Sequence, residues 1–302
     1  MQDLPRLVAV VGTNASGKSG LGVELALRFQ GEVISADSRQ VYRGLDLGSG
    51  KITPEEMRGV PHHLLDVCAP GAFFSVADFQ ALAYQAVDDI LARGRQPFLV
   101  GGTGLYVAAV CEGYALSDVA PDLAYRSELE QQNTADLYAM LCERLPSNGL
   151  DGANRNRVMR ALEKLHDGDP GPGQKKPWYQ VLTLGVSWPR DILCKRIDER
   201  LERRMAQGLL SEVQALLDAG VSPDFLRRLG LEYRYVCAYL LGEIPSLEGM
   251  TEELSRAIKR FAKRQMTWFR RDPSILWLDM AGDPLAQACE AVERFLMSDV
   301  TN

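Results

Sequence analysis

The stretch Gly12-Thr13-Asn14-Ala15-Ser16-Gly17-Lys18-Ser19 fits the pattern G-x-x-x-x-G-K-[ST]. It follows an apolar run at residues 7–11 that is typical of a buried strand, and residues 21–29 after it have helical spacing. A strand, a glycine loop and a helix in this order are the context in which the pattern predicts a phosphate-binding loop. The alternative is an ordinary glycine turn of an α/β protein.

The residue types in this loop suit a polyphosphate ligand. Glycines allow backbone N–H groups to turn toward an anion, and the following helix adds the positive end of its dipole. We expect Lys18 to neutralise phosphate charge and the Ser19 hydroxyl to hold Mg²⁺. The motif predicts what is bound, but not which reaction follows.

Composition narrows the class of protein. The 302 residues are 46% hydrophobic and 25% charged, which is ordinary for a globular chain, and the length suits either one large domain or one domain with a subdomain. We expect no signal peptide and no membrane span. The six cysteines are widely spaced, without a C-x-x-C pair, and the three histidines show no ligand spacing. These features predict reduced thiols in a cytoplasmic protein that has no zinc site, with a monomer as the default state.

Apolar runs and helical patterns alternate along the chain. Residues 7–11, 32–36, 97–100, 181–186 and 275–278 are predicted strands, and helical patterns include residues 76–93 and 190–219. This alternation predicts an α/β fold, a mostly parallel sheet flanked by helices as in P-loop NTPases. We expect residues 1–116 to form the first part of this core and residues 179–302 its second part.

Residues 117–178 interrupt the predicted core and are mostly helical in character. Helical patterns lie at residues 137–145 and 155–165, and the Gly/Pro run at residues 167–173 is typical of a loop that returns to the core. We therefore predict an inserted helical subdomain.

Two further segments end predicted strands at the same edge of the sheet as the phosphate loop. Asp37 follows the second strand and is predicted to hold a metal through water, to accept a proton, or to cap a helix. Gly101-Gly102-Thr103-Gly104 follows the third strand. The glycines favour either close backbone approach by a ligand or a simple strand-to-helix turn.

The segment Arg256–Arg271 has seven basic residues and no acidic one, although the chain carries a net charge of −6. Ile258, Phe261, Ala262, Met266 and Phe269 recur at helical spacing and are predicted to face the core. The basic residues would then form an exposed face beside Trp268. It is either a solvated surface or a binding face for a nucleic-acid backbone, and the single sign of the charge favours the second.

Five blocks, in order along the chain, resemble motifs of the tRNA dimethylallyltransferase (isopentenyltransferase) family. In the first half of the chain, D-S-R-Q-V-Y-R-G-L-D at 37–46 matches the family pattern D-S-x-Q-V-Y-x-x-x-D, and H-H-L-L-D at 62–66 matches H-H-L-x-D. The block G-G-T-G-L-Y at 101–106 has the same letters as the family motif. In the second half, N-R-V-M-R-A-L-E at 156–163 resembles Q-R-x-x-R-A-L-E, and A-K-R-Q-M-T-W-F-R-R at 262–271 matches A-K-R-Q-x-T-W-x-R-R.

The resemblance implies a specific reaction. The family transfers a dimethylallyl group from dimethylallyl diphosphate to the exocyclic amine of the adenosine just 3′ of the anticodon. The loop Gly12–Ser19 would then bind the diphosphate as a leaving group, stabilised by Lys18, Mg²⁺ and Arg200, which is similar to a family arginine that reaches the diphosphate. Asp37 would be the general base for the amine. Thr103 would orient the amine or the diphosphate.

The resemblance also implies a surface for the anticodon stem-loop of tRNA. The adenosine has to leave its stack to reach a buried site, so the protein must hold the surrounding RNA. The residues expected near the acceptor RNA are Asp37, Ser38, Arg39, Gln40 and Thr103 at the base, Arg126, Asn156, Arg157 and Arg160 in the insertion, and Lys263, Arg264, Gln265, Trp268 and Arg270 in the basic segment.

Several positions depart from the family pattern. Asn14 stands where threonine is usual, Ser19 where threonine is common, and Asn156 where glutamine is usual. Gly48-Ser49-Gly50-Lys51 replaces G-T-A-K, and Arg228-Leu229-Gly230-Leu231-Glu232-Tyr233 replaces I-G-Y-K-E. Ser19 keeps the hydroxyl for the metal, whereas the change at Asn156 weakens the assignment of that residue to tRNA.

Three alternatives compete with this interpretation. An adenylate isopentenyltransferase would use the same chemistry on free AMP, ADP or ATP, but it would not need the basic segment or Arg157 and Arg160. A small-molecule kinase would use the loop for ATP and would leave the block at 37–46 unexplained. A non-enzymatic RNA-binding protein would not need Lys18, Ser19 and Asp37.

Overall fold

The computed structural model describes residues 4–116, 122–168 and 175–298. The chain divides into two compact units. The larger joins Met1–Gly113 to Pro177–Asn302, and the smaller is Tyr114–Lys176. Most of the predicted Gly/Pro loop, from residue 169 to 173, lies outside the described residues. No described helix is both long and apolar enough to cross a membrane.

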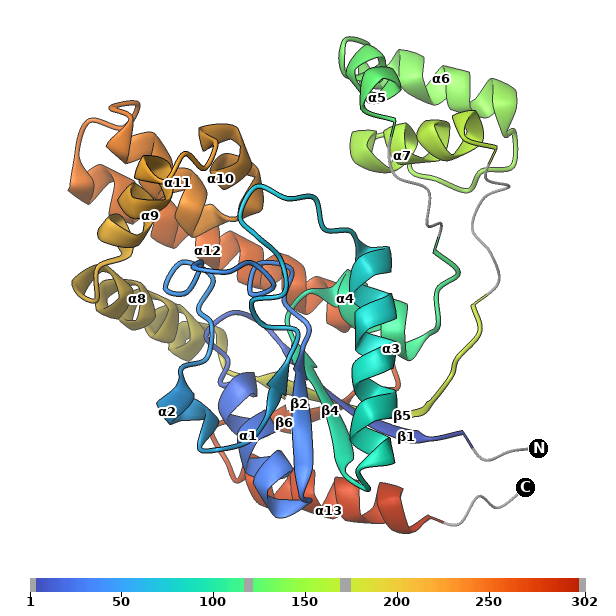
Figure 1. Cartoon of the computed structure of the whole chain (residues 1–302), viewed down its shortest axis with the longest axis vertical. Helices are drawn as coiled ribbons and strands as arrows, with labels where there is room; N and C mark the ends of the chain where they lie inside the picture. The colour runs from blue at the N-terminus through green and yellow to red at the C-terminus, as the bar shows by residue number, and fades with distance from the viewer. Residues whose placement is uncertain (1–3, 117–121, 169–174, 299–302) are drawn as a thin grey trace. The chain divides into compact units, whose positions relative to one another are not determined.

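The larger unit is built on a six-stranded, wholly parallel sheet with the order β3-β2-β4-β1-β5-β6 (Figure 1). The five predicted strands are confirmed, and the predicted α/β fold with them. The two-residue strand β3 was not predicted, because two residues are too few to show a periodicity. The strands are β1 (Arg6–Gly12), β2 (Gly31–Ser35), β3 (His62–His63), β4 (Gln96–Gly101), β5 (Gln180–Ser187) and β6 (Leu276–Asp279).

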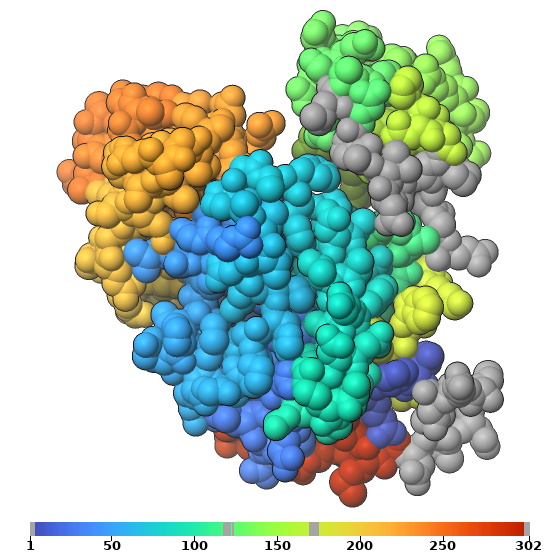
Figure 2. Space-filling view, viewed as in Figure 1, coloured from blue at the N-terminus to red at the C-terminus, as the bar shows by residue number. Residues whose placement is uncertain are grey.

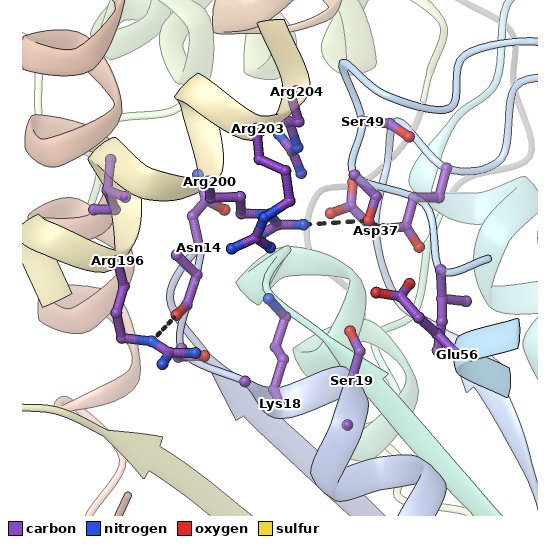
Figure 3. Close-up of a pocket in the computed structure, with 18 of the residues that line it drawn as sticks. Asn14, Lys18, Ser19, Asp37, Ser49, Glu56, Arg196, Arg200, Arg203 and Arg204 are labelled. Carbon is purple, nitrogen blue, oxygen red and sulfur yellow. Dashed lines mark hydrogen bonds between the residues drawn. The ribbon is translucent and has the colours of Figure 1, made fainter. Parts of the chain in front are cut away.

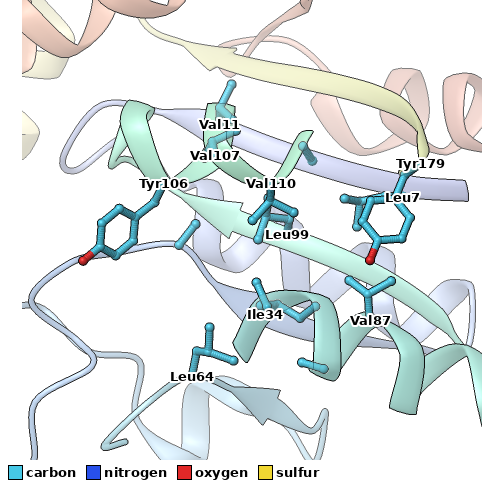
Figure 4. Close-up of a cluster of buried hydrophobic side chains, with 14 of the residues drawn as sticks. Leu7, Val11, Ile34, Leu64, Val87, Leu99, Tyr106, Val107, Val110 and Tyr179 are labelled. Atoms are coloured by element: carbon cyan, nitrogen blue, oxygen red, sulfur yellow. The ribbon is translucent and has the colours of Figure 1, made fainter. Parts of the chain in front are cut away.

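The central strand β1 explains why its sequence is a continuous apolar run. It lies between β4 and β5, and its side chains alternate between two buried clusters. Leu7, Ala9 and Val11 pack with α3 (Val76–Ala92) and α4 (Gly104–Cys111) on one face (Figure 4). Val8 and Val10 pack with α1 (Lys18–Arg28) and α13 (Pro284–Met297) on the other.

A third cluster lies beside the sheet and shapes the site. Val41, Tyr42 and Leu45, from the segment after β2, are buried against the helices that follow β5. In the space-filling view this segment (blue to cyan) lies against those helices (gold to orange) (Figure 2). The remaining helices of this unit are α2 (Pro54–Met57), α8 (Arg190–Ala206), α9 (Leu209–Asp218), α10 (Pro223–Leu229), α11 (Leu231–Leu240) and α12 (Leu247–Phe269).

The helical pattern predicted over residues 190–219 is confirmed, and it forms two helices, α8 and α9. Gly208 has a φ of 102°, in the left-handed region that favours glycine, and it separates α8 from α9. α8, which ends before this break, carries the residues that line the cavity at the phosphate loop.

The described part of the smaller unit contains α5 (Leu123–Glu130), α6 (Thr134–Arg144) and α7 (Arg155–His166). The side chains of Asp122, Asn133 and Asn154 cap the three helices by accepting hydrogen bonds from backbone N–H groups of the first turn. The core of this unit is formed by Leu129, Leu137, Leu141, Val158, Met159 and Leu162.

Candidate active site

The phosphate loop connects β1 to α1. Gly17 has a φ of 91°, which only glycine adopts readily, and it is followed directly by the first turn of α1. The Ser16 hydroxyl and the Lys18 amine both donate hydrogen bonds to the carbonyl of Thr13, at 2.8 and 3.2 Å. These contacts curl the loop around its own backbone and place Lys18 beside the N-terminus of α1.

A cavity of about 470 Å³ opens over this loop (Figure 3). Residues 14–20 of the loop and α1 form one wall, the segment after β2 forms another, and α8 forms a third. Gly12 and Thr13, which were also predicted to bind the diphosphate, lie buried beneath the loop and do not line the cavity.

Four arginines of α8 line the same cavity: Arg196, Arg200, Arg203 and Arg204. Their spacing places them on one face of a helix, because residues three and four apart are neighbours. Figure 3 shows side chains from α8 extending toward the wall from which Lys18 and Ser19 rise. Of these arginines only Arg200 was predicted, although the spacing was visible in the sequence.

Two of the arginines also hold the walls of the cavity together. The Nε of Arg196 donates to the carbonyl of Ala15 at 2.9 Å, and its guanidinium lies 4.7 Å from the centre of the Trp188 ring. Arg200 donates to the carbonyl of Gly50 at 3.4 Å. The α8 wall is thereby tied to the phosphate loop and to the segment after β2.

The pKa values show that positive charge is crowded in this cavity. Burial and the charge of Arg200 lower the pKa of Lys18 to about 8. Burial and the charge of Arg204 lower the pKa of Arg200 to about 9. Each cation lowers the pKa of its neighbours. A bound anion would therefore stabilise the charged form of all of them at once, as expected of a polyphosphate site.

Asp37 lies across the cavity from these cations and is tied to Arg39. Its Oδ1 accepts the backbone N–H of Arg39 at 3.0 Å and lies 3.5 Å from the Nε of the same residue. No described helix begins at residues 37–40, so the alternative that Asp37 caps a helix is wrong. The carboxylate is left to face the cavity that Lys18 and Arg200 also line.

Arg39 is also bonded to a second carboxylate, Glu232 on α11, at 2.9 Å. Burial lowers the pKa of Arg39, but the charges of Asp37 and Glu232 outweigh that effect and raise it overall. The neighbouring Gln40 is held in the same way, since its amide accepts from the Ser35 hydroxyl at 2.8 Å and donates to Gly50 at 3.1 Å. The side chains of Arg39 and Gln40 therefore both bond to other residues of the protein. Glu232 was not among the predicted site residues.

Thr103 lies next to the cavity rather than in its lining. It is the N-cap residue of α4, and its hydroxyl accepts the backbone N–H of Ser38 at 3.2 Å. A Cβ on Gly101 would lie 2.1 Å from the carbonyl of Ala36, and one on Gly102 would lie 2.8 Å from Nε2 of Gln265. In this structure the glycines therefore permit close packing against Ala36, which follows β2, and against α12.

The basic segment forms the second half of α12 and the two residues after it. Lys263, Arg264 and Arg270 are exposed, as predicted for a binding face. Trp268 is only partly buried and packs against Gly104, where an added Cβ would lie 2.3 Å from its ring. Of the residues predicted to face the core, Ile258, Ala262 and Phe269 are buried and Phe261 and Met266 are partly buried.

Gln265 does not share the exposed face of its neighbours. It is 7% exposed, and its side-chain amide joins the phosphate loop to the loop after β4. The sequence carried a signal for this arrangement, since position 265 falls on the same helical stripe as Ile258, Ala262 and Phe269.

In the smaller unit, the residues predicted to contact tRNA differ in whether their side chains already bond to other residues of the protein. Asn156 and Arg157 are exposed at the start of α7. Arg126 and Arg160 both bond to the buried carboxylate of Glu163, at 3.2 and 3.0 Å. The guanidinium groups of Arg126 and Arg160 are therefore partly committed to the core of this unit.

Comparison with known proteins gives a consistent result. The family model described as IPP transferase matches residues 40–272, and the model described as isopentenyl transferase matches residues 5–73. The chain is 45% identical over 300 residues to tRNA dimethylallyltransferase 2 of Shewanella sediminis, covering 95% of this chain and 97% of the relative. It is 46% identical over 288 residues to tRNA dimethylallyltransferase 2 of Syntrophotalea carbinolica, covering 92% and 96%.

Solved structures have the same fold. The full-length tRNA isopentenylpyrophosphate transferase of Bacillus halodurans is 41% identical, covers 96% of this chain and 95% of its own, and superposes with a TM-score of 0.73. A eukaryotic dimethylallyltransferase acting on tRNA has a TM-score of 0.81 at 22% identity, covering 97% of this chain and 79% of its own, which is evidence for the fold alone.

Proposed function

The chain belongs to the IPP transferase family and is a tRNA dimethylallyltransferase, and on that premise we propose its two substrates. The donor is dimethylallyl diphosphate, and the acceptor is the exocyclic amine of the adenosine 3′ to the anticodon. The observation that carries this proposal is the cavity in which Lys18 and Arg200 lie across from Asp37.

The reaction breaks the C–O bond between the allyl group and the diphosphate and forms a C–N bond to adenine. Negative charge builds on the leaving diphosphate, where Lys18, Arg200 and the N–H groups of the loop stabilise it. The amine is a poor nucleophile and loses a proton as the new bond forms, and Asp37 accepts that proton. Thr103, bonded to Ser38, holds the wall beside Asp37 in place.

Ser19 is the residue that would hold Mg²⁺ beside the diphosphate. Its hydroxyl is exposed to the cavity at the start of α1. The described residues hold no group of three or more His, Cys, Asp or Glu side chains that could bind a metal. This fits Mg²⁺, which commonly takes one or two protein ligands and completes its shell with substrate phosphates and water. When bound, the ion would add positive charge beside the leaving diphosphate.

The exposed residues of the basic segment support tRNA as the acceptor rather than free AMP. Lys263, Arg264 and Arg270 offer phosphate contacts that a mononucleotide does not need. Asn156 and Arg157 of the smaller unit provide a second set of contacts. The enzyme acts as a cytoplasmic monomer in this proposal.

A transfer assay tests the assignment directly. Labelled dimethylallyl diphosphate and Mg²⁺ are mixed with the full chain and with unmodified tRNA, an anticodon stem-loop lacking the target adenosine, or AMP. Label in tRNA alone supports the proposal. Label in AMP alone assigns the chain to free nucleotides, and ATP turnover without transfer points to a kinase.

A further inference from the structure

Gly50 lies where two arginines of α8 approach the backbone. Its φ is +66°, and a Cβ built on it would lie 1.7 Å from one terminal nitrogen of Arg204 and 2.3 Å from that of Arg200. No side chain of any size fits beside the present position of Arg204. This is also a position at which the sequence departs from G-T-A-K, with glycine in place of alanine. The guanidinium of Arg204 thus fills the volume that a methyl group would take.

Arg204 lines the cavity and is 8% exposed. Among the described residues, its one ion-pair partner is Glu232, whose Oε1 lies 3.2 Å away. The other oxygen of that carboxylate bonds to Arg39 at 2.9 Å. A guanidinium carries five N–H donors in a rigid fork, so a single shared carboxylate leaves most of the hydrogen-bonding capacity of Arg204 unused.

The excess of basic over acidic side chains in the cavity favours the binding of an anion. Its lining includes seven basic and five acidic side chains. Burial lowers the pKa of Arg204, and the charge of Glu232 opposes that effect. A cavity that crowds cations in this way gains most from a ligand that carries several negative charges.

We propose that Arg204 is a direct ligand of the donor's diphosphate, admitted to the cavity by Gly50 and held in place by Glu232 when no anion is bound. This inference rests on the proposed function, which assigns the cavity to the diphosphate. A guanidinium suits the role because its planar fork can donate two parallel hydrogen bonds to phosphate oxygens. Glu232 is then a positioning residue that orients Arg204 and competes with the ligand for it.

Titration of inorganic pyrophosphate into the full chain tests the inference, with Mg²⁺ present and heat as the readout. Arg204→Met should weaken binding by roughly 10- to 100-fold, the effect of losing a charge-assisted hydrogen bond. Glu232→Gln should bind at least as tightly as the unchanged protein, because the competing charge is gone. Arg190→Met removes an exposed arginine from the same helix, outside the cavity lining, and should leave binding unchanged.

Opposite results overturn the inference. If Arg204 serves only to neutralise Glu232, both variants will lower the melting temperature while pyrophosphate binding stays unchanged. If the unchanged protein does not bind pyrophosphate at all, the proposed function fails, and this inference fails with it. Intact binding in Arg204→Met refutes only the inference.

A second pair of variants covers the case in which Arg204→Met does not fold. Gly50→Ala should displace the guanidinium groups of both Arg204 and Arg200 and weaken pyrophosphate binding. Gly44→Ala is the matched control, because Gly44 has a similar φ of +72° but no neighbouring atom within 4 Å of the added Cβ. Equal affinity in the two variants would mean that the guanidinium groups beside Gly50 do not bind pyrophosphate, and this result would overturn the inference.

Discussion

The side chain of Gln265 on α12 is bonded to the backbone of Asn14 in the phosphate loop. Its Oε1 accepts the N–H of Asn14 at 2.9 Å, and its Nε2 donates to the carbonyl of Gly102 at 2.9 Å. One buried amide therefore joins the helix proposed to bind tRNA to two loops of the active site. The N–H of Asn14 is used within the protein, so the phosphate cradle must come from the later residues of the loop.

Replacing Gln265 by leucine should destabilise the protein. The substitution leaves a buried N–H and a buried carbonyl without a partner, which costs about 1–3 kcal/mol for each group. We expect the free energy of unfolding to fall by roughly 2 kcal/mol or more, and the KM for the donor to rise. Urea unfolding measures the first effect, with Gln214→Leu at an exposed position as the control. An unchanged unfolding free energy would show that the bridge is not formed in solution.

Asp37→Asn should abolish transfer but keep tRNA binding. Asparagine retains an oxygen to accept the N–H of Arg39, so the local turn should persist. Loss of a general base commonly lowers kcat by about 10²- to 10⁴-fold. Single-turnover transfer and a filter-binding assay with tRNA separate the two effects. Turnover close to that of the unchanged enzyme would remove Asp37 as the base.

Binding of pyrophosphate should weaken as the pH rises through about 8. Lys18 is charged below its lowered pKa of about 8 and loses its proton above it, so its attraction for the anion disappears in that direction. Arg200, with a pKa of about 9, loses charge only at higher pH. Calorimetry between pH 7 and 8.5 therefore isolates Lys18.

The control for this pH dependence is Lys18→Met, which should bind weakly at every pH. It also records the contribution from the titration of pyrophosphate itself. If the difference in affinity between the two proteins stays constant from pH 7 to 8.5, Lys18 keeps its charge over that range, and the prediction fails.

The double variant Lys263→Ala/Arg264→Ala should raise the KM for tRNA and leave the KM for the donor unchanged. Each lost phosphate contact should also reduce the slope of log K against log salt by about one. Arg28→Ala/Arg294→Ala removes two exposed arginines from α1 and α13 and serves as the control. A change confined to the donor KM would assign the basic face to the diphosphate site.

Two arginines in the first turn of α7 should behave differently. Arg155 donates to the carbonyls of Leu129, Glu130 and Gln132, so Arg155→Ala should lower the thermal stability of the smaller unit. Arg157 is exposed, so Arg157→Ala should weaken tRNA binding without a change in stability. Differential scanning calorimetry and tRNA binding distinguish them. If both variants lose only stability, α7 does not contact tRNA.

The strands and the phosphate loop could be predicted because their signals are local. The apolar run at β1 and the glycine pattern after it depend only on neighbouring residues. The same reasoning did not separate residues 190–219 into two helices, because the helical pattern continues through Gly208, at which the backbone turns. It also missed β3, which exists only because two residues meet the edge of β2.

The sequence by itself determined the fold class, the phosphate loop with Lys18, and the spacing that places the basic residues of α8 and α12 on helix faces. Only the tertiary structure decided the partners of those residues: Arg39 pairs with Asp37 and Glu232, and Gln265 faces inward to Asn14. The physical reason is the separation along the chain between the residues that interact. Periodicity fixes the direction of a side chain relative to its own helix or strand, whereas a pairing across about 200 residues depends on packing that no local pattern encodes.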